Sequence, residues 1–136
     1  MSAATDEVLS ITGEGDIVAV RRAVREAAHG VGFGVTDTTR IVTAASELAR
    51  NVCKYAGQGT VHLRRVERDG RGGLQLEFED HGPGIPDVAL ALEQGYSTSG
   101  GLGLGLPGAK RLMDETDIRS DVGCGVTVSV TKWLGS

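Results

Sequence analysis

The sequence has few of the features that mark exported proteins, membrane proteins, or proteins stabilised by structural zinc or disulfides. It holds two cysteines, Cys53 and Cys124, which are far apart and lack the paired spacing of a zinc site or a disulfide framework. No apolar run approaches the roughly 20 residues that cross a bilayer, and the N-terminal MSAATDEVLS has neither a basic start nor an apolar core. We therefore expect a soluble, cytoplasmic protein without a membrane partner.

A concentrated basic surface is also missing. The chain has 14 Lys and Arg residues against 18 Asp and Glu residues, for a net charge of −4, and its cations are scattered among acids. This pattern argues against a nucleic-acid partner, whose phosphate backbone needs a basic surface. With 136 residues, of which 40% are apolar, the chain has the length of one compact domain.

Glycine, by contrast, is concentrated in the stretch STSGGLGLGLPGAKRLMD, residues 97–114. Pro107 opens a predicted helix there, with Lys110 and Arg111 one turn further on. Glycines let the backbone approach a ligand closely, and free N–H groups at a helix N-terminus bind anions, so the stretch favours a phosphate-binding loop. The alternative, a flexible linker, conflicts with its interleaved leucines. The stretch lacks the G-x-x-x-x-G-K-[ST] pattern and the preceding strand of a dinucleotide fingerprint.

The periodicity of the remaining sequence predicts an α+β sandwich, with an antiparallel or mixed sheet covered by helices on one face. The predicted helices are Asp16 to a stop at Gly30, a longer one capped by Thr36 or Asp37 and running to Ala56 before Gly57, a short piece at Val88–Leu92, and Pro107–Glu115. The predicted strands are Glu7–Thr12, Thr60–Arg68, Leu74–Asp80, Asp117–Asp121 and Val126–Lys132, with DGRGG as the turn of the first hairpin. In the last strand the valines are expected to face inward, and Thr127, Ser129 and Thr131 outward.

Asp80 stands out because of its strand parity. It shares a face with Leu74, Leu76 and Phe78, so its carboxylate is expected on the core side, where an unpaired charge costs several kcal/mol. A planar ligand with an amino group, such as adenine, would satisfy this acid, and the glycines of the following HGPGIPD would leave room for the ligand. The alternative is a strand-end Asp that turns into solvent or caps the HGPG turn.

On the long helix, Glu47, Asn51 and Lys54 are spaced to line one face beside the apolar stripe. Periodicity alone indicates a solvated helix face. Asn is nevertheless a poor helix former, which favours a ligand role for Asn51. Its neutral oxygen suits Mg²⁺, and Glu47, one turn earlier, has the chemistry to accept a proton from water or a hydroxyl.

Three segments in this order, SELARNVCKYAG, EDHGPGIPD and GGLGLGLPGAKRL, closely resemble the nucleotide-binding motifs of the GHKL ATPase superfamily. Within this superfamily, the chain resembles the RsbT-type serine/threonine kinases in its small size and in the residues of its motifs. These kinases are the switch proteins of bacterial stress-response signalling. The likeness extends over nearly the whole chain, so residues 1–136 are interpreted as a single ATP-binding kinase domain with the Bergerat-type fold.

The resemblance implies a role for each matching residue. Asp80 would accept the adenine amino group, Asn51 would hold Mg²⁺, Glu47 would be the catalytic base, and Thr127 would support Asp80 through its hydroxyl or a water. Val126 stands where such proteins often carry a further Thr. The remaining nucleotide contacts implied are Gly82, Gly84, Ile85, Gly100, Gly101, Leu102, Gly103, Leu104 and Gly105, with Arg50, Lys54, Lys110 and Arg111 as weaker candidates for phosphate contacts.

The function implied is transfer of the ATP γ-phosphoryl group to a Ser or Thr of a STAS-domain antagonist protein, with ATP and Mg²⁺ as cofactors. In such a partner switch the kinase then engages another partner, commonly a phosphatase that it activates. One alternative is an anti-sigma factor that sequesters an RNA-polymerase sigma subunit. Another is an ATP-binding module that no longer performs transfer.

Overall fold

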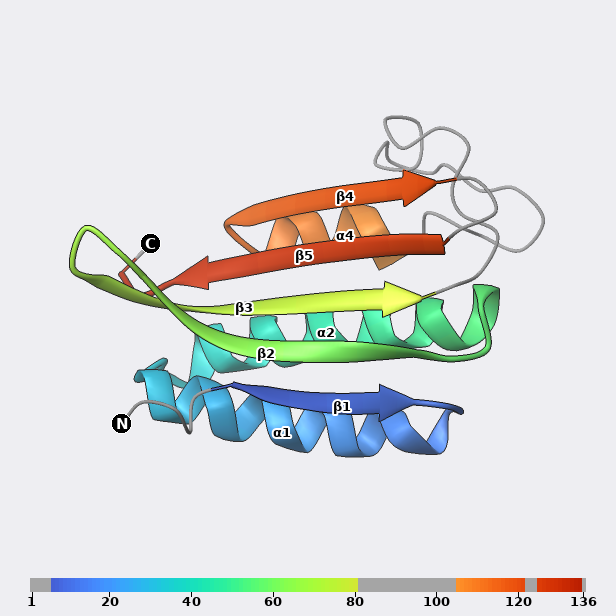
Figure 1. Ribbon diagram of the computed structural model, residues 1–136. Coiled ribbons are helices and arrows are strands. Elements are labelled where there is room, and N and C mark those ends of the chain that lie inside the picture. Colours follow the sequence, from blue (N-terminus) through green and yellow to red (C-terminus); the bar gives the residue numbers. More distant parts are fainter. Residues whose placement is uncertain (1–5, 81–104, 122–124, 136) are drawn as a thin grey trace.

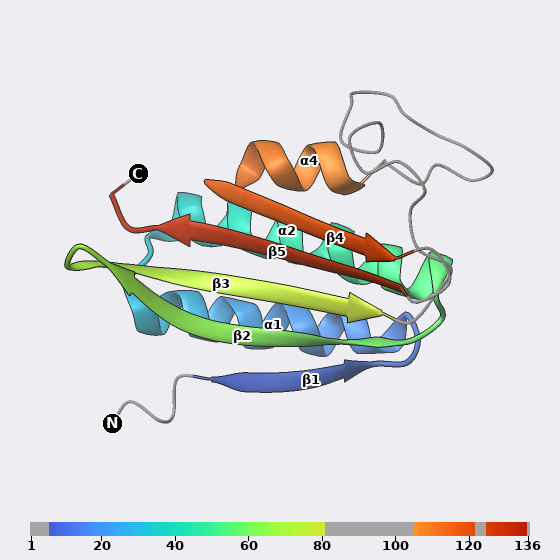
Figure 2. The same ribbon diagram turned by 45° about the horizontal axis from the view of Figure 1, so that its top comes forward.

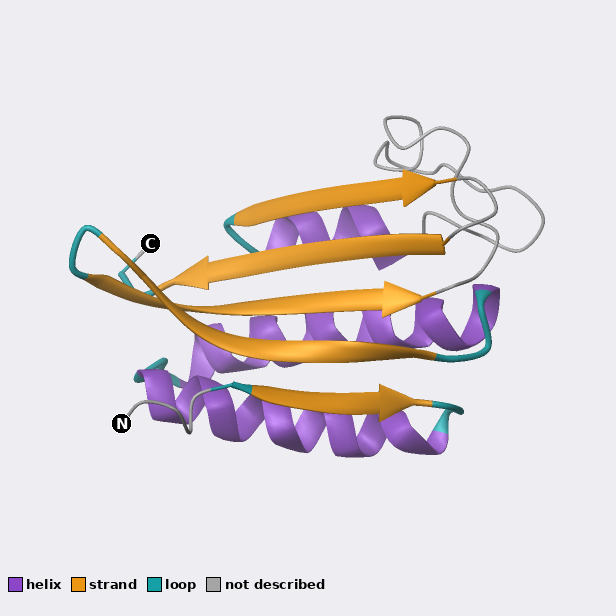
Figure 3. Cartoon of the chain, viewed as in Figure 1, coloured by secondary structure: helices purple, strands orange, loops and turns teal. Residues whose placement is uncertain are grey.

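The computed structural model describes residues 6–80, 105–121 and 125–135, which form a sheet covered on one face by helices (Figures 1 and 3). The described strands are β1 (Glu7–Ile11), β2 (Gly59–Arg68), β3 (Arg71–Asp80), β4 (Glu115–Asp121) and β5 (Gly125–Trp133). Their order across the sheet is β1-β2-β3-β5-β4, and each neighbouring pair is antiparallel. The predicted α+β class is confirmed. The sequence left open whether the sheet is antiparallel or mixed, and in the described residues it is antiparallel.

The helices α1 (Gly15–Val31) and α2 (Val35–Tyr55) lie against the sheet on the same side, and α4 (Gly105–Leu112) packs beside α2 (Figure 2). α1 turns Ile17, Val20 and Val24 into the core, as their spacing predicts. No described helix combines the length and the apolar character that crossing a membrane would require.

Two predicted helix ends are wrong. α1 continues through Gly30 and ends at Gly32, whose φ of 115° lies in the left-handed region that glycine tolerates best. α2 begins after Gly34 rather than at a Thr36 or Asp37 cap, because the Gly34 carbonyl already accepts the Thr38 N–H at 2.9 Å. The predicted stop at Gly57 is confirmed, with a φ of 84° just beyond the helix.

The first hairpin turn is shorter than predicted. Asp69 and Gly70 alone form it, with φ values of 54° and 79°, and Arg71 already pairs with Arg68. An Asp-Gly pair suits the two-residue turn with two positive φ angles, so the strands can pair up to it. The predicted turn residue Gly73 is a strand residue, where a Cβ would lie 2.6 Å from the Trp133 ring.

The helix α4 begins at Gly105 and ends at Leu112, so both ends lie earlier in the chain than the predicted Pro107–Glu115. After Leu112 the Asp114 N–H donates to the Thr131 carbonyl at 2.9 Å, which starts the pairing of β4 with β5. Glu115, expected at the helix end, is therefore the first residue of β4. The predicted helical piece at Val88–Leu92 lies outside the described residues.

The core fills the space between the sheet and the helices. Leu74, Leu76 and Phe78 are buried, as their alternation predicts. Thr131 has the parity of Thr127 and Ser129 and so lies on the outward face, as predicted. It is nevertheless only 5% exposed, between Gln75 on β3 and Glu115 on β4.

Candidate nucleotide-binding site

The elements that carry the candidate site residues meet at one end of the molecule. α2 ends, β3 ends and α4 begins at the same edge, to the right in Figure 1, and the turned view of Figure 2 agrees. α4 also packs against α2 along the helical layer. Asp80 closes β3, Asn51 lies one turn before the end of α2, and Gly105 opens α4. Asp80, Asn51 and Gly105 are thus gathered at one end of the fold.

Asp80 is half-buried at the end of a central strand. Its neighbours across the sheet are Gly59 on β2 and Val126 on β5, and the Val126 backbone N–H donates to the Asp80 Oδ1 at 3.3 Å. Phe78, two residues earlier on the same face, is 2% exposed. The carboxylate therefore lies at the end of the core face of β3, near the buried Phe78 and the backbone N–H of Val126.

Gly59 makes the close packing at this point possible. A Cβ at Gly59 would lie 2.9 Å from Val52 Cγ1 on α2 and 3.3 Å from the Cα of Asp80, closer than side chains ordinarily approach. The last turns of α2 therefore pack directly against the strand end that carries Asp80. Sequence reasoning missed Gly59, although a glycine at the start of a strand after a helix stop is a signal of close backbone approach.

On α2, Glu47 and Asn51 are half-buried, and Arg50 and Lys54 are exposed. The Glu47 Oε1 lies 3.6 Å from the Arg50 Nη1. This contact is loose, because the Glu47 and Arg50 side chains are 41% and 53% exposed, and exposed pairs of this kind contribute little. Glu47 and Asn51 therefore supply one carboxylate and one amide oxygen on the same helix face. These hard oxygen donors fit Mg²⁺, which takes few ligands from protein and keeps its waters and phosphates.

The strand register does not support the expected role of Thr127. Thr127 lies opposite Glu79, not Asp80, and residues directly opposite each other in antiparallel strands share a face. The Asp80 carboxylate faces the helices together with Val126, whereas Thr127 belongs to the other face of the sheet. At this position the backbone N–H of Val126 donates to the Asp80 Oδ1.

The remaining predicted contacts fall into two groups. Gly105 is the first residue of α4, and Lys110 and Arg111 are exposed on the same helix. Outside the described residues lie Gly82, Gly84, Ile85, Gly100, Gly101, Leu102, Gly103 and Leu104.

Comparison with known proteins decides the family. Residues 12–132 match the family model described as the histidine kinase-like ATPase domain. The chain belongs to this family. It is 52% identical over 124 residues to the serine/threonine-protein kinase RsbT of Bacillus subtilis, an alignment that covers 91% of this chain and 93% of RsbT. The anti-sigma F factor of Thermoanaerobacter sp. is 26% identical over 106 residues, which are 75% of this chain and 74% of that protein.

Solved structures agree on the fold. The RsbU and RsbW domains of a Mycobacterium tuberculosis protein match with a TM-score of 0.62 and 22% identity, over 93% of this chain and 32% of that longer one. The mycobacterial sensor histidine kinase MprB matches with a TM-score of 0.56 and 24% identity, over 93% of this chain and 96% of that structure. These likenesses concern the fold alone.

Family membership and the similarity to RsbT confirm the enzyme class predicted from the motifs: the chain is an ATP-dependent enzyme of the serine/threonine-protein kinase class. The roles of individual side chains in ATP binding and transfer stay predictions.

Proposed function

We propose that this kinase transfers the γ-phosphoryl group of ATP to a Ser or Thr hydroxyl of a STAS-domain antagonist protein in a bacterial partner-switching pathway. The observation that carries the proposal is the meeting of Asp80, the Glu47 and Asn51 face of α2 and the first residue of α4 at one end of a kinase-family fold. The name of the 52% identical relative supports the transferase reaction.

Each residue of the site has a distinct task in this proposal. Asp80 accepts a hydrogen bond from the adenine amino group, and the side chains of Val52 and Val126 pack against the adenine ring. Glu47 accepts the proton of the attacking hydroxyl or orients it, so positioning supplies most of the catalysis. Asn51 holds Mg²⁺, which when bound neutralises charge on the phosphates. Backbone N–H groups at the start of α4 and in the glycine-rich stretch before it stabilise charge on the transferred group.

The partners follow from the same proposal. Phosphorylation places about two negative charges on the STAS protein and breaks its complex with the kinase, because like charges and desolvation oppose the contact. The released kinase then engages a second protein, for which we propose a phosphatase that it activates. These events take place in the cytoplasm, where ATP is the phosphoryl donor.

An alternative output is the binding of an RNA-polymerase sigma factor, which the 26% identity to an anti-sigma F factor favours. Purification of the tagged chain from its own cells distinguishes the kinase function from sigma-factor binding. A STAS protein or phosphatase in the eluate supports the kinase switch, and a sigma factor in their place supports the alternative.

Purified chain, labelled ATP and candidate STAS proteins test the reaction itself. Glu47→Ala is expected to lower phosphoryl transfer by about 10²- to 10⁴-fold while ATP affinity is retained, since general-base catalysis contributes that much. The control is Glu67→Ala, which removes an exposed glutamate of β2 at the other end of the sheet.

Two results would count against the proposal. Transfer that survives Glu47→Ala unchanged removes Glu47 from the mechanism. A wild-type chain that binds ATP but phosphorylates none of the STAS proteins is an ATP-binding module without transferase activity.

A further inference from the structure

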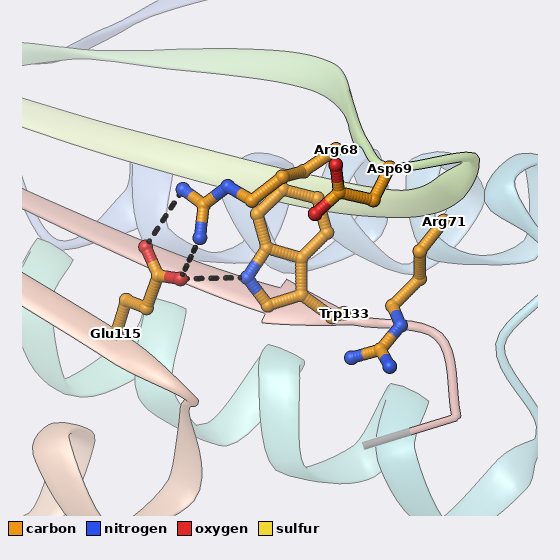
Figure 4. Close-up of a pocket in the computed structure, with 5 residues that line it drawn as sticks. All are labelled: Arg68, Asp69, Arg71, Glu115 and Trp133. Carbon is orange, nitrogen blue, oxygen red and sulfur yellow. Dashed lines mark hydrogen bonds and ion pairs between the residues drawn. The ribbon is translucent and has the colours of Figure 1, made fainter.

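A pocket of about 250 Å³, which we call the Trp133 pocket, lies at the end of the molecule opposite the candidate nucleotide site. Its lining residues are Arg68, Asp69, Arg71, Glu115 and Trp133 (Figure 4). It forms where the turn between β2 and β3 meets the start of β4 and the end of β5, to the left in Figure 1. An occupant of this pocket would not compete with ATP.

One wall of the pocket is a bonded cluster from three strands. The Glu115 Oε2 accepts hydrogen bonds from the Arg68 Nη1 at 2.6 Å and from the Trp133 indole N–H at 2.9 Å. The Arg68 guanidinium lies over the Trp133 ring, 4.6 Å from its centroid. The hydrogen bonds from Arg68 and Trp133 lower the pKa of Glu115. The Glu115 carboxylate is therefore already paired within this wall.

Arg71 differs from Arg68 in having its donors available. Figure 4 shows its guanidinium beyond Trp133, on the side away from Glu115. Within residues 6–80, 105–121 and 125–135 it makes neither an ion pair nor a side-chain hydrogen bond. A guanidinium presents several N–H donors in a rigid fork that matches a carboxylate. The pocket thus offers a ready partner for an incoming acid.

Size and charge narrow the class of ligand. The pocket is smaller than the ~300–1,000 Å³ typical of cofactor sites, and the paired Arg68 and Glu115 side chains at its edge are 60% and 45% exposed. It can receive one side chain but cannot enclose a cofactor. Asp69 and Glu115 repel a doubly charged phosphate about twice as strongly as a single carboxylate, so a carboxylate is the anion that meets less opposition on its way to Arg71. Tryptophan and arginine are also the residues that most often dominate protein interfaces.

We propose that the Trp133 pocket is a docking site for an acidic segment of a protein partner, which inserts an Asp or Glu side chain to pair with Arg71. The proposal rests on the proposed function in that a kinase that exchanges protein partners needs contact surfaces besides its ATP site. It adds where one such contact lies and which chemistry it recognises.

Trp133 is the single tryptophan of the chain, so its fluorescence reports on this pocket directly. The probe is a blocked Gly-Glu-Gly-Glu-Gly peptide, titrated against the full chain without ATP. Its amide counterpart Gly-Gln-Gly-Gln-Gly and inorganic phosphate are the comparison ligands. The acidic peptide is expected to change the Trp133 emission saturably, and the two comparison ligands are not.

Variants locate the contact. Arg71→Gln is expected to weaken peptide binding about tenfold, the loss expected for one charge-assisted pair, and Arg71→Lys by less. Arg119→Gln is the matched control, because it removes the same charge from an exposed arginine of β4 outside the pocket. The ATP affinity of all three variants is expected to equal that of wild type.

The proposal is overturned if wild type gives no saturable change, if the amide peptide or phosphate binds equally well, or if Arg71→Gln binds as wild type does. The assay is independent of the proposed function. A chain that binds the acidic peptide but transfers no phosphoryl group would refute the transferase mechanism and leave the pocket assignment standing.

Discussion

Gly59 is the residue at which α2, β2 and the acid at the end of β3 come closest together. A side chain at this position would lie 2.3 Å from the Glu79 carbonyl oxygen and 2.9 Å from Val52. The carbonyl oxygen belongs to the paired backbone of β3, and Val52 is buried, so neither neighbour has room to move. The absence of a side chain at Gly59 therefore sets the position of Asp80 relative to α2.

We expect Gly59→Ala to lower the free energy of unfolding by about 2 kcal/mol, because overpacking of this kind forces backbone shifts. Urea denaturation measures the change. Gly108→Ala is the control: a Cβ there meets no described atom within 4 Å, and alanine favours the helix α4 by up to about 1 kcal/mol. A Gly59→Ala protein as stable as wild type would contradict this account of the packing.

Asp80 and its neighbours on β5 show which contacts can be predicted from the sequence and which cannot. Strand parity alone predicted that Asp80 would continue the face of Phe78, and the register agrees. The same reasoning cannot find Val126, because which residue lies opposite Asp80 depends on how two distant strands align. The role of Thr127 stays a prediction that the register does not favour, since a shift of one residue moves a side chain to the other face of the sheet.

Among the elements, β2, β3 and β5 are joined on the outer face of the sheet by a charged cluster. The Glu77 Oε1 accepts a hydrogen bond from the Arg64 Nη1 at 2.8 Å, and the Ser129 hydroxyl reaches the Glu77 Oε2 at 3.4 Å. The hydrogen bond from Arg64 lowers the pKa of Glu77, with a smaller contribution from Ser129. Each of three adjacent strands contributes one member of this cluster.

This cluster makes stability depend on pH in one direction. Because the folded pKa of Glu77 lies below the unfolded value, its stabilisation is complete above the unfolded pKa and is lost as the pH falls through the folded pKa. Glu77→Gln is therefore expected to cost up to about 1 kcal/mol near neutral pH and little under acid conditions. Urea unfolding across the acid range tests this, with Glu79→Gln, an exposed neighbour on the same strand, as control. Parallel pH profiles for wild type and Glu77→Gln would refute it.

Elements were predictable where one periodicity runs through a segment, as in α1, α2 and β3. Their ends were less so. The chain leaves α4 at Leu112 because Asp114 pairs with Thr131, and it extends β3 back to Arg71 because Asp69 and Gly70 suffice for the turn. The stop of α4 depends on Thr131, 17 residues after Asp114 in the sequence, and no local pattern contains that partner.

For the whole molecule, the helical layer and the sheet place two distinct sites at opposite ends. The candidate nucleotide site lies where α2 and β3 end, and the Trp133 pocket lies at the hairpin end (Figures 1 and 4). A nucleotide that binds only the folded chain must stabilise the whole domain by mass action.

A non-hydrolysable ATP analogue with Mg²⁺, at about 100 times its dissociation constant, is expected to raise the free energy of unfolding by about 2.7 kcal/mol. If Asp80→Asn weakens binding about tenfold, the same concentration adds only about 1.4 kcal/mol. Chemical denaturation with and without the analogue measures both values, and Asp117→Asn, an exposed acid on β4, is the control. Equal stabilisation of wild type and Asp80→Asn would remove Asp80 from the nucleotide site.

By itself, the sequence determined the helices and strands, the α+β class and the three motifs of an ATP-dependent kinase, because periodicity, glycine spacing and motif order are local properties. Tertiary structure decided the strand order β1-β2-β3-β5-β4 and, with it, every neighbour that lies far away along the chain. Gly59 and Val126 flank Asp80, and Arg68, Glu115 and Trp133 form one cluster, only because antiparallel pairing brings distant strands into register.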